Sequence, residues 1–247
     1  MTKIQDVKEF WERNLCLEKY LESQCLTREY FEEGYNLRYK YHYHIPREVG
    51  ELASLRKGAK VLEIGVGMGI DTALLCKMGF RVTGIDLTEK SVQATKARLA
   101  FYNLPAKIRT GNAEDLEFDD ESFDVVYSFG VLHHTPNTEK AIGEIHRVLK
   151  KDGIAFIMLY HRHSLNYLAH KITNTSFDGT KDDWCPEEKA YTKDEAMDMF
   201  SRFSKVEIKV DYLFGTGWGW ANYLVWMPVK KILGKLIGWH LLIRVTR

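Results

Sequence analysis

A glycine-rich turn flanked by two carboxylates has the residue types and spacing of a site for an adenosine-containing ligand. The turn holds three glycines at alternate positions, Gly65, Gly67 and Gly69. Glu63 precedes the turn, and Asp86 ends the next apolar segment. Glycines let a ligand approach the backbone where a Cβ atom would block it. A carboxylate placed like that of Asp86 can accept hydrogen bonds from both ribose hydroxyl groups. We therefore expect this stretch to hold an adenosine-like group.

The elements around the turn are predicted to be a strand, a helix and a second strand. Residues 61–64 are mostly apolar, residues 70–78 carry apolar side chains in a helical pattern, and residues 81–85 form another strand-like run. This order is a βαβ unit, in which a helix connects two parallel strands. Ligands of open α/β sheets bind at the carboxyl ends of the strands, which is where the turn and Asp86 are expected.

The spacing of the glycines separates two kinds of adenosine ligand. A dinucleotide site favours G-x-G-x-x-G, with the pyrophosphate at a helix N-terminus, but Ile70 occupies the third glycine position here. The carboxylate of Glu63 would repel a pyrophosphate and suits a cationic ligand. VLEIGVGMG followed by VTGID resembles the first two motifs of the class I S-adenosylmethionine (SAM)-dependent methyltransferases. An NAD(P)-dependent oxidoreductase is the alternative on the same fold, and Ile70 and Glu63 both count against it.

Further motifs extend the resemblance from about residue 59 to residue 160. G-N-A-E-D at 111–115 resembles the adenine-binding turn of the family, commonly G-D-A, with Asn112 in place of aspartate. DVVYSFGVLHH and EIHRVLKKDG also resemble the family pattern. Asn112 can still offer its carbonyl to the adenine amino group, although the pairing loses its charge. The resemblance implies SAM as the cofactor, bound by residues of these motifs: Glu63, Gly65, Val66, Gly67, Gly69, Asp86, Leu87, Asn112, Ala113, Glu114, Ser128 and Phe129.

Methyl transfer from SAM needs few catalytic side chains, because the activation lies in the cofactor and the protein mainly positions and desolvates. A base helps where the acceptor is a hydroxyl group or a protonated amine, and histidine suits that role. Three histidines follow predicted strand ends on the cofactor side and are candidate bases: His133, His134 and His161. Tyr160 is a neighbour that could orient the acceptor. Structural support is the favoured role of His133 or His134 taken singly. No metal site is predicted, because the H-x-H pair at 42–44 lacks a suitably spaced third ligand.

The whole chain, residues 1–247, is predicted to form one α/β domain. A Rossmann-like three-layer αβα sandwich is expected, with a seven-stranded, mostly parallel sheet, an antiparallel last strand and additional N-terminal helices. Residues 1–46 are the predicted helical extension and residues 59–160 the cofactor-binding core. Residues 161–191 and 213–238 are predicted insertions on the substrate side.

The N-terminal extension has two interpretations. The favoured one is a pair of helices that packs on the domain. The alternative is that the extension covers the cofactor, as an N-terminal helix often does in similar methyltransferases, and this would bring Arg38 and Tyr41 to SAM.

The acceptor is predicted to be a small molecule that contacts the inserted segments. The predicted acceptor-side residues are His163, Trp218, Trp220 and Tyr223. Glycine-punctuated tryptophans are poor structural elements, which favours a role in lining the acceptor site. The helix expected at 229–237 is predicted to pack its apolar face on the sheet. An interfacial membrane helix and a mobile lid are the alternatives for this segment.

Composition excludes several classes of function. The net charge of +1 gives no electrostatic basis for binding nucleic acid. No apolar run is long enough to span a bilayer, although peripheral membrane contact stays open. The four cysteines lie far apart without a C-x-x-C pair, as in a reduced, cytoplasmic setting. The predicted function is metal-independent methyl transfer from SAM to an oxygen or nitrogen atom of a small molecule. A SAM-binding partner subunit without turnover is a further alternative, and the oligomeric state is not predicted.

Overall fold

A mixed β-sheet lies at the centre of the computed structural model, which describes residues 2–180, 182–214, 218 and 224–247. The strand order is β3-β2-β1-β4-β5-β8-β7, and β8 runs antiparallel to both β5 and β7. The strands are β1 (Lys60–Ile64), β2 (Arg81–Asp86), β3 (Ala106–Thr110), β4 (Phe123–Phe129), β5 (Leu149–His161), β6 (Ala190–Tyr191), β7 (Lys205–Asp211) and β8 (His240–Thr246). The predicted sheet with its antiparallel last strand is confirmed, and the short β6 beside β5 is an addition to it.

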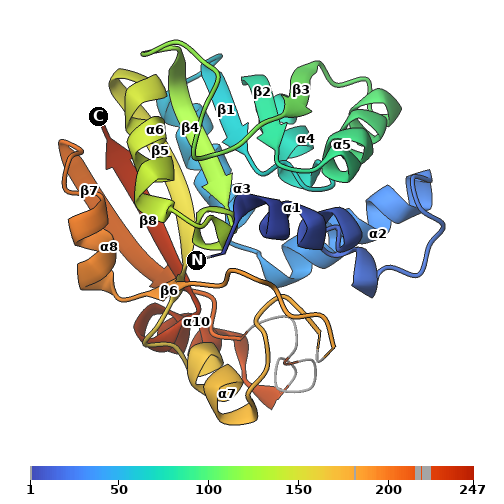
Figure 1. Ribbon diagram of the computed structural model, residues 1–247, viewed down its shortest axis with the longest axis vertical. Helices are drawn as coiled ribbons and strands as arrows, with labels where there is room; N and C mark the ends of the chain where they lie inside the picture. Colours follow the sequence, from blue (N-terminus) through green and yellow to red (C-terminus); the bar gives the residue numbers. More distant parts are fainter. Residues whose placement is uncertain (1, 181, 215–217, 219–223) are drawn as a thin grey trace.

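Helices cover both faces of the sheet and give the predicted three layers (Figure 1). The helices are α1 (Ile4–Arg13), α2 (Arg28–Tyr41), α3 (Ile45–Leu55), α4 (Ile70–Lys77), α5 (Glu89–Phe101), α6 (Thr138–Val148), α7 (Leu165–Thr173), α8 (Lys193–Met199) and α10 (Met227–Ile237), with the 3-10 helices η1 (Glu18–Tyr20) and η2 (Leu132–His134). Side chains of α3 and α4 share a core cluster with one face of the sheet, and side chains of α6 and α8 share a cluster with the other.

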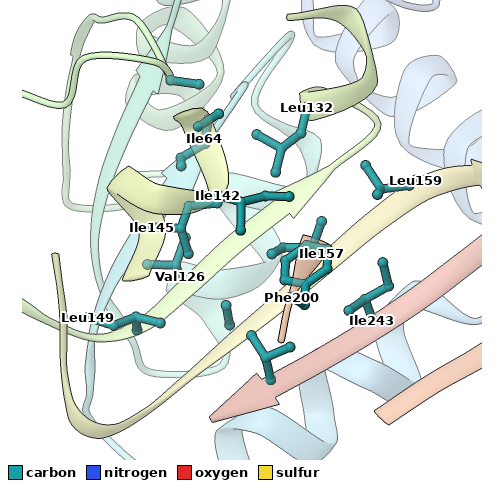
Figure 2. Close-up of a cluster of buried hydrophobic side chains, with 14 of the residues drawn as sticks. Ile64, Val126, Leu132, Ile142, Ile145, Leu149, Ile157, Leu159, Phe200 and Ile243 are labelled. Atoms are coloured by element: carbon teal, nitrogen blue, oxygen red, sulfur yellow. The ribbon is translucent and has the colours of Figure 1, made fainter. Parts of the chain in front are cut away.

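Successive side chains of the central strands point alternately to the two faces of the sheet and so join these two clusters. In β5, Ile157 packs with the α6 and α8 cluster, whereas its neighbour Phe156 packs with the α3 and α4 cluster. Successive side chains of a strand point to opposite faces of the sheet. A parallel strand covered on both faces is therefore apolar throughout. Figure 2 shows the α6 and α8 cluster, in which Ile142 and Ile145 of α6 lie over Val126 of β4.

The parallel register brings the loops that carry the predicted site to one edge of the sheet. Ile64 at the end of β1 pairs with Ile85 and Ser128, and Asp86 at the end of β2 pairs with Thr110. The segments that follow β1, β2, β3 and β4 therefore start at the same level. This edge holds the carboxyl ends of the parallel strands, the expected place for a ligand.

The helix predicted at 229–237 exists as α10, but its predicted packing holds only in part. Gly234 is buried and lets the helix approach the end of β7, where an added Cβ atom would lie 3.3 Å from the Tyr212 backbone nitrogen. Val229, Ile232 and Leu236 are exposed. Leu233 and Ile237 also pack against the Leu213 and Phe214 cluster, so the contact face of α10 is narrow and the other apolar side chains stay uncovered. Among the described residues, no helix has both the length and the apolarity of a membrane span.

Candidate active site

A deep pocket lies at the carboxyl edge of the sheet. About 1020 Å³ of space free of protein atoms lies within its outline, a volume that includes open solvent. The loops after all four parallel strands β1 to β4 contribute to its wall. Of the predicted cofactor-binding residues, those that line it are Arg38, Glu63, Gly65, Val66, Gly67, Asp86, Leu87, Asn112, Ala113 and Phe129. The structure thus brings together most of the residues that the motifs suggested.

The three glycines of the turn have backbone conformations that favour glycine, with φ of 81° at Gly65, 53° at Gly67 and 74° at Gly69. Their surroundings differ. A Cβ atom on Gly65 would lie 2.1 Å from Val131 Cγ2, and one on Gly69 would lie 3.0 Å from Thr95 Cα. These two glycines therefore allow the turn to pack against its neighbours. A Cβ atom on Gly67 would meet no atom closer than 4.0 Å, so its missing side chain leaves open space beside the pocket.

Asp86 connects the second strand to the glycine turn. Its Oδ2 accepts a hydrogen bond from the Gly67 N–H at 3.0 Å, and its Oδ1 accepts from the Thr88 N–H at 3.0 Å and the Thr88 hydroxyl at 2.9 Å. Burial raises the pKa of this carboxyl, an effect that the three hydrogen bonds oppose. A carboxylate has about four acceptor positions. Asp86 therefore keeps capacity for a ligand while it fixes the conformation of the turn.

Glu63 and Arg38 bring a carboxyl group and a guanidinium group to the same pocket. Glu63 is buried, and its Oε2 has no hydrogen-bond partner in the described part of the chain. Burial raises the pKa of Glu63 well above its usual range. Arg38 Nη2 donates to Asp71 Oδ2 at 2.6 Å, and the Tyr127 hydroxyl donates to the same carboxylate at 2.9 Å. A buried acceptor without a donor is costly, so Glu63 fits a ligand that carries donors or positive charge.

Two predicted adenine-side residues line the pocket and one does not. Asn112 and Ala113 lie in the wall. Asn112 Oδ1 accepts from the Glu114 N–H at 3.0 Å, which closes a tight turn. The carboxylate of Glu114 instead accepts from the Asn137 N–H at 2.7 Å, next to the start of α6. We therefore find a structural partner for Glu114 outside the pocket.

The end of β4 presents only one of its two predicted residues to the pocket. Phe129 lines it, and the Arg38 guanidinium lies over its ring at 4.8 Å. Ser128 is fully buried, is not part of the wall, and its hydroxyl has no described partner. The alternation of side chains along a strand accounts for this difference between adjacent residues.

Among the candidate bases, His134 is the one that lines the pocket. Its Nδ1 lies 2.8 Å from the Glu187 carbonyl oxygen, and its Nε2 lies 3.4 Å from Asp178 Oδ2. Because a carbonyl can only accept, Nδ1 is the protonated nitrogen, and Nε2 carries the lone pair of the neutral ring. The Tyr160 hydroxyl donates to the same Asp178 oxygen at 2.9 Å. His134, Asp178 and Tyr160 thus form one polar cluster beside the pocket, and burial raises the pKa of Tyr160.

The other candidate histidines occupy different surroundings. His133 is fully buried under the Tyr160 ring, with ring centroids 3.8 Å apart, and neither ring nitrogen has a described partner. Burial holds the pKa of His133 well below its ordinary value. His161 is buried, and its Nδ1 donates to the Gly238 carbonyl at 2.9 Å. His163 is exposed. None of these three lines the pocket formed by the glycine turn.

The N-terminal extension covers the pocket, which the favoured interpretation of the sequence did not foresee. Trp11 of α1 and the residues after it, Cys16 and Leu17, form part of the wall. Glu12 fixes α1 in place, because its carboxylate accepts from the Glu89 and Lys90 N–H groups at the start of α5. No local sequence motif identifies these residues as part of the pocket wall. The amphipathic pattern of residues 4–13 was the available signal, since such a helix must cover something.

Tyr41 lies apart from the first pocket. It lines a second pocket between the end of α2 and the start of α10, together with Tyr43, Tyr212, Met227 and Lys230 among others. Tyr41 is one turn beyond Arg38 in the same helix, and residues three apart are neighbours on a helix surface. The two side chains nevertheless reach different pockets. The alternative interpretation therefore places Arg38, but not Tyr41, in the wall of the site.

The acceptor-side predictions are placed only in part. Trp218 donates from Nε1 to Asn166 Oδ1 at 2.6 Å and packs near Phe214. It is not among the lining residues of either pocket. Trp220 and Tyr223 lie outside the described residues. No group of three or more histidine, cysteine, aspartate or glutamate side chains with the arrangement of a metal site occurs in the described ranges.

Comparison with known proteins shows that the chain is similar in sequence to methyltransferases. Residues 62–157 match a family described as Methyltransferase domain. The chain is 30% identical over 167 residues to the ubiquinone biosynthesis O-methyltransferase of Pseudomonas syringae pv. tomato, which covers 65% of this chain and 69% of that protein. It is also 30% identical over 112 residues to the protein of that name from Pelagibacter ubique, covering 45% of this chain and 46% of that one. The chain thus matches about half the length of the Pelagibacter relative.

The solved structures agree with the fold. A SAM-dependent methyltransferase from Thermotoga maritima has a TM-score of 0.64 at 19% identity, over 97% of this chain and 99% of that chain. At this level of identity, the likeness shows the shared fold alone.

Proposed function

Because the chain belongs to the class I SAM-dependent methyltransferases, we propose that it transfers a methyl group from SAM to an oxygen or nitrogen atom of a small-molecule acceptor. The observation that carries the proposal is the pocket wall. An unpartnered buried carboxylate oxygen of Glu63, an open glycine turn and the carboxylate of Asp86 face one space. The family and the fold imply SAM as cofactor, and these residues fit it. Two carboxylates suit a ligand with a sulfonium, an ammonium group and a ribose.

Each wall residue has a role in this proposal. Asp86 binds the ribose hydroxyls, Glu63 binds the ammonium group, and the turn at Gly67 lets the ligand lie against the backbone. Asn112 and Ala113 border the adenine. Arg38 compensates part of the negative charge, although its pairing with Asp71 makes it mainly a support for the wall. Trp11 and other residues of α1 form part of the pocket wall and exclude water from that side.

When bound, SAM supplies an electrophilic methyl group on a sulfonium cation. The chain's own residues position the acceptor, exclude water and accept its proton. We assign proton acceptance to His134, because the residue lines the pocket and its Nδ1 is held by the Glu187 carbonyl, which leaves Nε2 as the nitrogen that can accept a proton. The carboxylate of Asp178 stands 3.4 Å from that nitrogen and stabilises the imidazolium that forms. No metal has a role in this scheme.

The relatives indicate the kind of acceptor. The Pseudomonas and Pelagibacter proteins are O-methyltransferases of ubiquinone biosynthesis by name. An aromatic hydroxyl compound with an apolar portion is therefore our first candidate acceptor. Such a hydroxyl must lose its proton on transfer, which agrees with a histidine base near the cofactor.

Two binding and transfer experiments test the proposed function. Calorimetric titration of the purified chain with SAM and with NADH separates it from a dinucleotide-dependent oxidoreductase, since we expect binding of SAM only. Incubation with methyl-labelled SAM and a cell extract should then label a small molecule. Binding of NADH without SAM would overturn the cofactor assignment. Label in RNA or protein would reject the acceptor class, and the absence of any transfer would favour a SAM-binding subunit without turnover.

Replacing Asp86 by alanine is expected to weaken SAM binding about tenfold or more. The loss of charge-assisted hydrogen bonds to a ligand costs about 1.5–3 kcal/mol per bond, and about 1.4 kcal/mol corresponds to tenfold in affinity. Isothermal titration calorimetry measures the dissociation constant. Thr88→Val is the matched control, because it removes the hydroxyl that supports Asp86 but leaves the carboxylate in the pocket. An equal loss in both variants, or no loss in Asp86→Ala, would refute direct ribose binding.

A further inference from the structure

Two short helices remote from the glycine turn expose an unusual amount of apolar surface. On α7, Leu168 is 54% exposed and Ile172 is 75% exposed. At α10, Trp226, Ile232 and Leu236 are exposed by 73%, 62% and 67%. Half of the large apolar side chains that are exposed in the described ranges lie on α7 or in residues 224–237. We call the exposed sides of α7 and α10, with Trp226, the α7–α10 surface.

The two helices lie next to each other. Figure 1 shows α10 beside α7 at the lower end of the molecule. Both helices pack on the same small core of Leu213 and Phe214, α7 through Leu165 and α10 through Leu233 and Ile237. The inward positions of both helices are therefore already occupied. The exposed apolar side chains are additional to the packing that holds the helices in place.

Helical spacing arranges the exposed residues of α10 in two stripes. Val229, Ile232 and Leu236 recur at intervals of three and four and share one side of the helix. Lys231 and Lys235 are four apart and form a second stripe next to it. Both stripes are exposed, while Gly234 on the opposite side is buried. The helix therefore has a narrow buried side, an exposed apolar side and a cationic side.

The charged side chains of the two helices themselves have one sign. The sequence contains no aspartate or glutamate after Asp211, and residues 165–173 contain none either. Lysines lie in both helices, Lys171 in α7 and Lys230, Lys231 and Lys235 in α10. The chain as a whole is nearly neutral, with a net charge of +1. The excess of positive charge is therefore local to the exposed apolar residues.

We propose that the α7–α10 surface binds peripherally to a bilayer that contains anionic lipids. Apolar side chains that face solvent enter the boundary between headgroups and acyl chains, and lysines beside them bind lipid phosphates. Trp226, at the N-terminal end of α10, is the residue type that favours the headgroup level. A membrane satisfies both the apolar stripe and the lysine stripe at once. A second copy of this chain would instead bring the same lysines together in a symmetric contact.

The proposal does not depend on methyl transfer, because lipid binding requires neither SAM nor acceptor. Flotation of the full-length chain with vesicles measures it directly. We expect binding to vesicles of phosphatidylcholine mixed with phosphatidylglycerol, weaker binding to phosphatidylcholine alone, and release by added salt. The double variant Ile232→Glu/Leu236→Glu should lower the partition coefficient about tenfold or more, because it places charge in the apolar stripe. Lys231→Glu/Lys235→Glu should remove the preference for phosphatidylglycerol.

A matched control separates the effect of position from the effect of added charge. Leu55→Glu/Met78→Glu also converts two exposed apolar residues to glutamate, at the ends of α3 and α4, and should bind vesicles as the wild type does. Circular dichroism melting curves and SAM titration verify the fold of each variant. Absence of vesicle binding by the wild type would overturn the proposal. An equal loss of binding in Ile232→Glu/Leu236→Glu and in the control Leu55→Glu/Met78→Glu would also overturn it. So would a dimer in light scattering that dissociates in Ile232→Glu/Leu236→Glu without any vesicle binding.

Discussion

Replacing Gly67 by valine is expected to abolish SAM binding, with affinity lower by at least about 100-fold, or about 2.7 kcal/mol. Gly67 lines the pocket, and the nearest protein atom to an added Cβ would be Cys16 Cβ at 4.0 Å. The protein itself thus leaves this space open, and a branched side chain would fill it in place of the ligand. Titration calorimetry with SAM and its demethylated product measures the effect. The affinity for both ligands should fall together, because the valine side chain would block the part of the molecule that SAM and its demethylated product have in common.

Gly79 offers a control for backbone strain. Its φ is 85°, in the same left-handed region as the 53° of Gly67, and an added Cβ atom would meet nothing within 4 Å. Gly79 follows α4 and is exposed, away from the pocket wall. Gly79→Val therefore has the conformational cost of a β-branched residue at positive φ without the steric block. Equal SAM affinity in Gly67→Val and Gly79→Val would show that the turn does not contact the cofactor.

The fold could be predicted because its signals are local. Each central strand is a short apolar run, and each intervening helix has its own start and stop residues. Thr88 and Asn137, for example, accept from backbone N–H groups at the first turns of α5 and α6. The antiparallel last strand followed from the family resemblance. The two-residue β6 could not be predicted, because Ala190 and Tyr191 become a strand only by pairing with β5.

The pocket wall was predictable where a motif defines both residue and backbone, as at Asp86 and Gly67. It was not predictable where position depends on contacts distant in sequence. Trp11 reaches the pocket because α1 docks on the start of α5 through Glu12, a contact between residues 77 and 78 apart. Asp178 reaches His134 from an irregular segment without periodicity. Such placements follow from tertiary packing, and the sequence pattern carries no local signal for them.

Glu114 has a structural partner in addition to its predicted place in the cofactor site. The residue stands in the adenine-binding turn by sequence, yet its carboxylate accepts from the Asn137 backbone and lies outside the pocket wall. Acceptors near a helix start compensate unpaired N–H groups and the helix dipole. The neighbouring Asn112 closes the turn and still lines the pocket.

Replacing His134 by glutamine is expected to lower kcat about 10²–10⁴-fold, the usual contribution of general-base catalysis. The Glu187 carbonyl fixes Nδ1 as the donor, so Nε2 is the nitrogen that can accept a proton. Asp178 Oδ2 lies 3.4 Å from this nitrogen. The measurement is single-turnover transfer from labelled SAM to the acceptor found in the extract, with the SAM dissociation constant determined in parallel. That constant should stay nearly unchanged, because glutamine keeps the polar character of the wall.

Three further variants separate chemistry from support. Asp178→Asn should lower kcat less than His134→Gln does, since Asp178 acts through the histidine. His133→Gln should lower the thermal midpoint but leave kcat largely intact, because His133 is buried beneath Tyr160 and does not line the pocket. His146→Gln, on α6 against Phe203, should change neither quantity. The base assignment fails if His134→Gln retains the wild-type kcat, or if it only lowers the thermal midpoint as His133→Gln does. In either case His134 would be a structural residue, and positioning with desolvation alone would account for the rate.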